Sequence, residues 1–402
     1  MSKLGVVIVG VGGAVASTVV AGVALMLRGL VPRVGMITEE GGDTPNSPIV
    51  GLLGSDLARL DELVFAGWDI NATSVFDGAL HHKVLPAAQL DAVRGDLEKI
   101  TPWPAIFKTD YATTLSGDNV IGTNSFREQI AIVSSHIEQF KAKHGLDRCV
   151  MVNLASTESF IETNGVHASL AAFEAGLDAN DPAISPSMRY FYAANQRRVP
   201  YCSFTPGPAS QALNEQATEL GNPFCGSDGK TGQTLVKTAL ASMFRLRQLK
   251  ILGWYSMNIL GNNDGRCLES PSSNKTKVLS KASVLDSIVG YPVENHQVHI
   301  HYYKPRGDAK EAWDNIDIGG FAGIPMQMKI NFLCEDSVLA APLVLDLVRL
   351  LDVAKRRGER GNQRQLSMFF KAPYASAGET PTHDLFKQEK LLLDWAQAKR
   401  SQ

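Results

Sequence analysis

The sequence lacks an excess of charge of either sign. Its 402 residues include 39 Lys and Arg against 41 Asp and Glu, which gives 39 − 41 = −2 as the formal charge. A protein that binds nucleic acid or an anionic membrane surface through its overall charge is usually strongly basic. The composition therefore indicates no nucleic-acid partner and no membrane partner.

Cysteines are few, and long hydrophobic runs are missing. The five cysteines are scattered and form no CxxC pair, which favours reduced thiols in a cytosolic protein over a disulfide framework or a zinc knuckle. Glycines interrupt the N-terminal apolar run, and no cleavage pattern of small residues follows it, unlike a signal peptide. The next run, residues 14–27, is too short and too rich in Ser and Thr to span a bilayer. We therefore expect a cytoplasmic protein.

The first 250 residues alternate between strand and helix patterns. Residues 5–10 (GVVIVG) predict a strand buried on both faces, and residues 11–29 predict a helix ended by Gly29. A helix with its apolar residues at helical spacing is expected over 125–143. The other expected strands are 33–40, 149–156 and 199–205. This order predicts a doubly wound α/β domain.

The hydrophobic period changes after about residue 250. Strict alternation in 296–304 and 326–334 predicts strands with one packed and one polar face, usually antiparallel, and 251–260 is expected to join the same sheet. A second domain with an open polar sheet face is therefore expected here. Helical spacing returns at 337–355, with Asp336 or Ser337 as the cap.

Three glycines, Gly10, Gly12 and Gly13, mark the turn between the first strand and the first helix. Glycines there let the backbone approach a pyrophosphate at the helix N-terminus, although any tight strand-to-helix turn also needs glycine. Their place at the start of an α/β domain favours a dinucleotide. The acid expected to bind the ribose is Glu39, Glu40 or Asp69, and the sequence does not choose among them.

The segment SDGKTGQT, residues 227–234, precedes an amphipathic helix. Thr231 is the expected N-cap, and Gly232, Gln233 and Thr234 would then offer first-turn N–H groups and a hydroxyl to an anion. The inward face is expected to carry Val236, Ala239, Leu240, Met243 and Phe244. An ordinary capped helix is the alternative.

A carboxylate in a glycine- and asparagine-rich turn, Asp264, is followed by Lys275, Lys277 and Lys281. Lys277 and Lys281 stand at i, i+4, where like charges destabilise a helix by about 0.2–0.5 kcal/mol. A solvated surface tolerates such a small cost easily, so an ordinary exposed helix is a strong alternative. Lys371 lies between apolar neighbours and is expected to be partly buried. His296, His299 and His301 suggest a metal site, against the commoner alternative of histidines on a strand surface.

Taken together, eight segments resemble the myo-inositol-1-phosphate synthase family. They occur in the family's order between residue 5 and about residue 375, and they are GVGG, GWDIN, GSDGKTGQT, LGNNDG, TKVLSK, KPRGDAK, LCEDSVLAAPLVLDL and FFKAP. The resemblance implies an α/β fold: a Rossmann-like, doubly wound NAD-binding domain with an inserted α+β catalytic and oligomerisation domain whose mixed sheet is open. The implied boundaries are 1–230, completed by 337–402, for NAD binding and 231–336 for catalysis and tetramer formation.

The resemblance also implies a reaction. In this family, NAD takes a hydride from the fifth carbon of glucose 6-phosphate, and the ketone acidifies the protons on the sixth carbon. The resulting enolate attacks the aldehyde carbon, the ring closes, and the hydride returns, so the isomerisation to inositol 3-phosphate is redox-neutral. A lysine cluster stabilises the oxyanions that form. The resemblance leaves a requirement for a monovalent or divalent cation open, and it implies a homotetramer.

Site residues follow by matching these motifs. The resemblance implies catalytic roles for Lys277, Lys281, Lys310, Lys371, Asp264 and Asp228. It implies cofactor contacts for Gly10, Gly12, Gly13, Asp69, Ile70, Asp228 and Asp336. The implied phosphate site consists of Thr231, Gly232, Gln233, Thr234, Lys281 and Lys310.

The chain departs from the family pattern at three places. Ala14 and Val15 stand where two asparagines are usual, Ile259 stands where a histidine is common, and FTPGPASQAL (204–213) replaces a Gln-Asn-Thr segment. These changes leave a cyclase with a different cyclitol phosphate product as one alternative. An NAD(P)-dependent dehydrogenase of a phosphorylated metabolite is another. A regulatory sensor that binds NAD without turnover would lack acid–base residues, and here they are all present.

Overall fold

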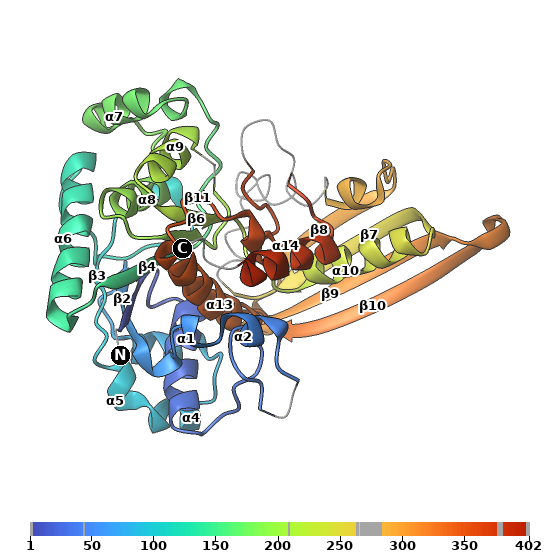
Figure 1. Ribbon diagram of the computed structural model, residues 1–402, viewed down its shortest axis with the longest axis horizontal. Coiled ribbons are helices and arrows are strands. Elements are labelled where there is room, and N and C mark those ends of the chain that lie inside the picture. Colours follow the sequence, from blue (N-terminus) through green and yellow to red (C-terminus); the bar gives the residue numbers. More distant parts are fainter. Residues whose placement is uncertain are drawn as a thin grey trace.

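The computed structural model describes residues 3–42, 45–207, 210–262, 265, 284–375 and 381–398. They build a seven-stranded sheet in the order β11-β6-β5-β4-β1-β2-β3 and a separate four-stranded sheet in the order β10-β9-β7-β8 (Figure 1). The strands described in the first sheet all pair in parallel. The expected fold class, a doubly wound parallel sheet with a second, mixed sheet, is confirmed.

The parallel sheet is buried on both faces. In β1, Leu4, Val6 and Ile8 point into one core while Val7 and Val9 point into the other, because successive side chains of a strand face opposite sides. This explains why the first strand has an unbroken apolar sequence. The strands are β1 (Leu4–Val9), β2 (Leu63–Asp69), β3 (Trp103–Pro104), β4 (Arg148–Asn153), β5 (Tyr201–Ser203), β6 (Pro223–Gly226) and β11 (Gly361–Asn362).

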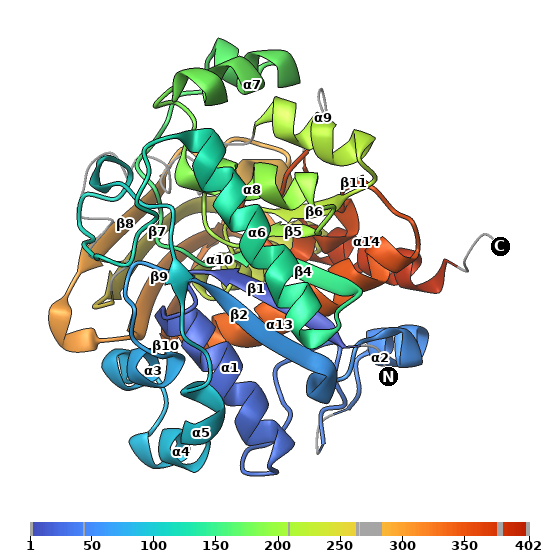
Figure 2. The same ribbon diagram turned by 90° about the vertical axis from the view of Figure 1, so that its left-hand side faces the viewer.

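Helices cover the two faces of this sheet. One core contains side chains of α1 (Ala14–Leu27), α2 (Pro48–Leu53), α3 (Val75–His82), α4 (Ala87–Ala92), α5 (Arg94–Leu97), α13 (Asp336–Arg356) and α14 (Leu385–Gln397). The other core contains side chains of α6 (Phe126–His144), α7 (Leu170–Ala179), α8 (Pro186–Gln196) and α9 (Gln211–Glu219). Figure 2 shows α6 crossing in front of the strands. The helices predicted over 11–29, 125–143 and 337–355 are confirmed within a few residues.

Short 3₁₀ turns join these elements. They are η1 (Gly54–Asp56), η2 (Leu60–Glu62), η3 (Thr109–Tyr111), η4 (Gly165–His167), η5 (Lys304–Arg306), η6 (Phe321–Gly323) and η7 (Arg364–Phe369).

The strand predicted over 33–40 is wrong, because this segment is a loop held by a helix. The backbone N–H groups of Ile37 and Thr38 donate to the carboxylate of Asp346 in α13, at 3.1 and 3.0 Å. Arg349 of the same helix pairs with Glu39 at 3.0 Å. The strand beside β1 is instead β2, more than twenty residues later in the chain.

The mixed sheet consists of β7 (Lys250–Leu260), β8 (His296–Tyr302), β9 (Ala309–Gly319) and β10 (Pro325–Glu335). β7 pairs parallel with β8 and antiparallel with β9, and β9 pairs antiparallel with β10. The three strands predicted in this region are confirmed, but β9 was not recognised. One of its inward positions is the buried carboxylate Asp314, which lies among apolar residues. Apolar and polar residues therefore do not alternate strictly along this strand.

Helix α10 (Gln233–Leu246) packs on one face of the mixed sheet, where Ala241 and Phe244 join a core with Trp254 and Ile316. The inward face predicted for this helix is partly wrong, since Met243 is 38% exposed while Lys237 is buried. In Figure 1 this sheet extends to the right, away from the parallel sheet.

Candidate active site

The glycine-rich turn between β1 and α1 is bound to the end of β2. The N–H of Gly12 donates to Oδ2 of Asp69 at 2.9 Å, and a Cβ on Gly12 would lie 3.1 Å from that oxygen. Gly10 has φ +83°, a conformation that favours glycine. β1 and β2 are parallel neighbours, so their carboxyl ends bring the turn and Asp69 together.

Asp69 is the one of the three candidate ribose acids that lies at this turn. Burial raises the pKa of its carboxyl, and hydrogen bonds from Asn71 and Gly12 act in the opposite direction. Glu39 is instead engaged in ion pairs with Arg33 and Arg349. The geometry therefore favours Asp69 over Glu39.

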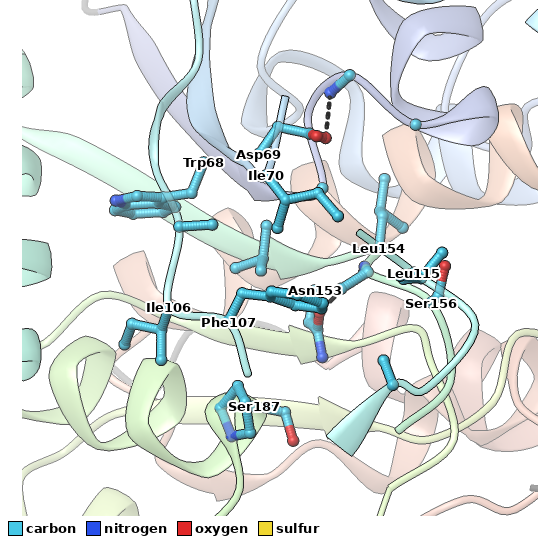
Figure 3. Close-up of a pocket in the computed structure, with 18 of the residues that line it drawn as sticks. Trp68, Asp69, Ile70, Ile106, Phe107, Leu115, Asn153, Leu154, Ser156 and Ser187 are labelled. Atoms are coloured by element: carbon cyan, nitrogen blue, oxygen red, sulfur yellow. Dashed lines mark hydrogen bonds between the residues drawn. The ribbon is translucent and has the colours of Figure 1, made fainter. Parts of the chain in front are cut away.

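A first pocket opens beside the turn and encloses roughly 990 Å³, its open mouth included. Figure 3 shows Asp69 directed at the turn, with its hydrogen bond drawn as a dashed line, and the side chains of Trp68, Ile106 and Phe107 nearby. All five predicted cofactor contacts in this region line the pocket: Gly10, Gly12, Gly13, Asp69 and Ile70. A large, mostly apolar cavity with a few polar groups is the usual form of a cofactor site.

Asp228 and Lys371 meet although they are far apart in the sequence. Lys371 N–H donates to the carbonyl of Asp228 at 2.6 Å, while Ser227 and Ala372 exchange two backbone hydrogen bonds of 2.9 and 3.1 Å. This short antiparallel pairing aligns the two side chains, and Nζ of Lys371 lies 2.8 Å from Oδ1 of Asp228. Both side chains are largely buried, at 11% and 5% exposed.

A second carboxylate, Asp336, joins two other predicted site residues. Its Oδ1 accepts a hydrogen bond from Thr231 Oγ1 at 3.0 Å, and its Oδ2 lies 3.5 Å from Nζ of Lys310. Thr231 is therefore not the N-cap of α10 as predicted, because its hydroxyl is directed to Asp336 and Gly232 occupies the cap position.

The beginning of α13 is held by Asp308. The N–H and the hydroxyl of Ser337 both donate to the Asp308 carboxylate, at 2.9 and 2.7 Å. The N-cap is Glu335, so the predicted caps Asp336 and Ser337 are wrong by one or two positions. Asn262 Nδ2 lies 3.5 Å from Oδ1 of the same carboxylate.

A second pocket of roughly 930 Å³ collects these groups. The predicted site residues that line it are Asp228, Thr231, Lys310, Asp336, Lys371 and Gly13. Gly232, Gln233 and Thr234 form the buried start of α10 and do not line it. Lys277, Lys281 and Asp264, together with Lys275, lie outside the described residues.

The proposed histidine metal site finds no support in the described part of the chain, where no group of three or more potential ligands is close enough to hold a metal ion. The rings of His299 and His301 stack with centroids 6.5 Å apart, which is the surface arrangement that the alternative reading expected. Among the described helices, none combines the length and the hydropathy that a membrane crossing requires.

The whole chain is similar to known proteins. The family model described as myo-inositol-1-phosphate synthase matches residues 4–397. The chain belongs to this family. It is 41% identical to "Inositol-3-phosphate synthase 1" of Bacteroides thetaiotaomicron, over 97% of this chain and 94% of that protein. It is 30% identical to "Inositol-3-phosphate synthase 1" of Oryza sativa subsp. japonica, over 97% of this chain and 84% of the relative.

Solved structures confirm the fold. The inositol-3-phosphate synthase of Caenorhabditis elegans superposes with a TM-score of 0.91 at 24% identity, over 98% of this chain and 85% of the other. A myo-inositol-1-phosphate synthase-related protein from Thermotoga maritima superposes with a TM-score of 0.78 at 22% identity, and both chains are covered completely.

The myo-inositol-1-phosphate synthase family binds NAD, and the residues present here fit that cofactor. Gly12 and Gly13 carry no side chain next to the N-terminus of α1, so a phosphate can approach the backbone there. At the other end, Oδ2 of Asp228 is buried and has no hydrogen-bond partner among the described residues, so a polar group of a ligand can satisfy it.

The sequence did not predict the burial of two lysines, Lys230 and Lys237. Nζ of Lys237 donates to Ser256 Oγ at 3.1 Å and lies 2.8 Å from Nε2 of His296, and burial lowers the pKa of Lys237 to about 8. Nζ of Lys230 donates to Gln388 Oε1 at 2.8 Å, and burial lowers its pKa to about 7. Lysines are solvent-exposed by default, and no local pattern signalled otherwise.

Proposed function

We propose that the chain converts D-glucose 6-phosphate to 1D-myo-inositol 3-phosphate in an NAD-dependent, redox-neutral cyclisation. The observation that carries this proposal is the second pocket, where Lys371 with Asp228 and Lys310 with Asp336 converge. Two cations held by carboxylates suit a reaction whose every step develops negative charge on an oxygen. The pocket adjoins the turn that fits NAD.

NAD, when bound, supplies the hydride acceptor for the oxidation and the hydride donor for the final reduction. Lys371 or Lys277 takes the proton from the hydroxyl at the fifth carbon and later returns it. Lys281 and Lys310 bind the substrate phosphate and stabilise the enolate, and Asp264 positions the lysines. The Lys371 side chain is 11% exposed, which supports its part of this assignment. An acid–base group shielded from water exchanges its proton with the substrate more than with solvent.

The other proposed contacts line the two pockets, except Gly232, Gln233 and Thr234 at the start of α10. Gly10, Gly12, Gly13, Asp69 and Ile70 hold the adenosine half of NAD, and Asp69 accepts a hydrogen bond from its ribose. Asp228 and Asp336 lie beside the nicotinamide half. Thr231 binds the substrate phosphate, together with first-turn groups of α10 supplied by Gly232, Gln233 and Thr234.

We further propose that residues 231–336 form the catalytic and tetramerisation domain, that 1–230 with 337–402 form the NAD-binding domain, and that the enzyme is a cytoplasmic homotetramer. The open face of the mixed sheet supports the assembly. Its exposed side chains include Tyr255, Trp313 and Leu333, at 42%, 44% and 59%, and large exposed apolar side chains on one face are typical of subunit contacts.

The test is an incubation of the purified protein with glucose 6-phosphate and NAD, followed by NMR of the product and by absorbance of NADH. We expect inositol 3-phosphate without accumulation of NADH. Steady accumulation of NADH would show a simple dehydrogenase instead, and a different cyclitol phosphate in the spectrum would correct the product.

A further inference from the structure

The two pockets meet along a short shared wall made by Gly13, His82, Leu154, Ala155 and Ser156, which line both. His82 and Ser156 are the two members with polar side chains, and His82 is the one whose side chain can carry a positive charge. A dinucleotide with its adenosine half in the first pocket and its nicotinamide beside Asp228 passes its pyrophosphate along this wall. The proposed NAD function thus places two negative charges next to His82.

Helix α3 brings His82 to the glycine-rich turn. A Cβ on Gly78 would lie 2.6 Å from the carbonyl oxygen of Gly12, so the helix packs directly against the turn. His82 follows Gly78 by four residues and therefore points to the same side of the helix. The backbone of Gly12 lies near enough to its ring to raise the pKa of His82.

The turn itself offers no side chain for a phosphate. Residues 12–15 are Gly, Gly, Ala and Val, which leaves only backbone N–H groups there. The described lining of the first pocket contains the carboxylates Asp69 and Glu158, and its titratable cations are His81 and His82. Of these two histidines, His82 alone also lines the second pocket.

We propose that His82 binds the pyrophosphate of NAD and takes up a proton when the cofactor binds; this rests on the proposed NAD-dependent function. In the free protein, burial and the neighbouring His81 lower the pKa of His82 below 6.5, while the Gly12 backbone, Asp69 and Asp308 raise it. The free ring is therefore neutral near pH 7. Pyrophosphate oxygens and the C-terminal end of α3 both favour the imidazolium.

The sign of the pH dependence follows from this. Binding raises the pKa of His82, so the complex holds more protons than the free protein, and NAD binds more tightly as the pH falls through the interval between the two pKa values. Each unit by which the pKa rises strengthens binding about tenfold at the acid end of that interval.

The experiment is isothermal titration of the full-length protein with NAD at about pH 6 and about pH 8, in pairs of buffers with different ionisation enthalpies. We expect the wild type to take up a fraction of a proton on binding and to bind more tightly at the lower pH. His82→Ala and His82→Gln should weaken NAD binding by about tenfold at pH 6 and abolish the proton uptake. ADP-ribose, which keeps the pyrophosphate and lacks nicotinamide, should behave like NAD.

Lys83→Asn is the matched control, because Lys83 is an exposed cation at the same helix end that lines neither pocket, and asparagine tolerates its left-handed conformation. It should bind NAD as the wild type does. If the wild type binds NAD without proton uptake, the role of His82 is overturned and the proposed function is left intact. The same holds if folded His82→Ala binds NAD as tightly as the wild type. A wild type that does not bind NAD at all overturns both.

Discussion

At the scale of single residues, the site depends on pairs that the chain brings together from distant segments. Asp228 and Lys371 are 143 positions apart, yet Nζ and Oδ1 lie 2.8 Å from each other. If either side chain is truncated, the charged group of the other stays buried without a partner. The folded protein then loses more stability than the pair itself contributes. The chemistry and the local stability of this pair are therefore linked.

We predict that Lys371→Ala lowers the turnover of glucose 6-phosphate by about 10²-fold or more, because one of the two lysines proposed as the general acid–base group at the oxidised carbon is lost. NAD should still bind, since the first pocket does not include Lys371. Turnover is measured by product NMR and NAD binding by titration calorimetry.

The control for this prediction is Lys390→Ala, which removes an exposed lysine of α14, 73% accessible, from its pair with Asp394. It should turn over substrate at the wild-type rate. Near wild-type turnover in Lys371→Ala, with the protein folded, would place the acid–base group elsewhere.

Some residue-level features could be predicted from sequence and others could not. The glycine turn was predictable because its chemistry is local: positive φ and close backbone approach require glycine. The choice of Asp69 over Glu39 was not predictable, because it depends on which segment pairs with β1. The burial of Lys237 also depends on packing of α10 against the sheet, and only the folded chain shows it.

At the scale of elements, helix α10 begins two residues after Thr231, which lines the second pocket, and contacts a polar layer within the mixed-sheet unit. Asp314 in β9 accepts hydrogen bonds from Gln233 at 3.0 Å, from Trp254 at 2.6 Å and from Ser256 at 2.7 Å. Ser256 in turn accepts one from Lys237. The start of α10, where the substrate phosphate is proposed to bind, is therefore fixed by the strands beneath it.

We predict that Lys237→Met changes the pH dependence of stability. The folded-state pKa of Lys237, about 8, lies below the unfolded value of 10.5. The unfolded state therefore binds more protons between these values, and wild-type stability rises with pH across that window. The contribution amounts to roughly 3 kcal/mol from pH 8 to pH 10.5.

The measurement is urea unfolding of both proteins at several pH values from about 7 to about 10. The difference in unfolding free energy should favour Lys237→Met most at the low end and shrink towards the high end. A difference that stays constant with pH would mean that Lys237 is protonated in the folded protein throughout. Lys250→Met, an exposed lysine at the start of β7, serves as the control.

The elements that could be predicted are those with a regular pattern of apolar residues in the sequence. α6 and α13 were predicted from apolar spacing and β1 from its unbroken apolar run, because these patterns are local and can be recognised without knowledge of the neighbouring elements. The segment 33–40 has a strand-like composition, but its backbone donors are satisfied by Asp346 instead of a neighbouring strand. β9 was missed for the opposite reason, because a tertiary hydrogen-bond layer places a carboxylate in its core face.

At the scale of the whole molecule, the C-terminal part of the chain returns to both sheets. α13 packs on α1 and on strands of the parallel sheet, and the residues after it supply Lys371 to the site. Asp384 then caps α14 and pairs with Arg245 of α10 at 2.6 Å. The two sheets are therefore connected by a part of the chain that also lines the second pocket.

The open face of the mixed sheet gives the last prediction. Trp313 lies near the centre of this face, where it pairs with Met257 on one side and Asn331 on the other, and it is 44% exposed. We predict that Trp313→Glu weakens the proposed tetramer by about tenfold or more in dissociation constant, because aromatic side chains at the centre of an interface contribute most to binding. Sedimentation velocity over a range of concentrations measures the change.

The subunit itself should remain folded in this variant, because the indole lies on the side of the sheet away from the core formed with α10. Leu30→Glu is the matched control: Leu30 is 53% exposed and follows α1, far along the chain from the mixed sheet. If Leu30→Glu stays tetrameric while Trp313→Glu dissociates, the open sheet face is the contact. Tetramers of equal stability in both variants would show that the subunits associate through another surface.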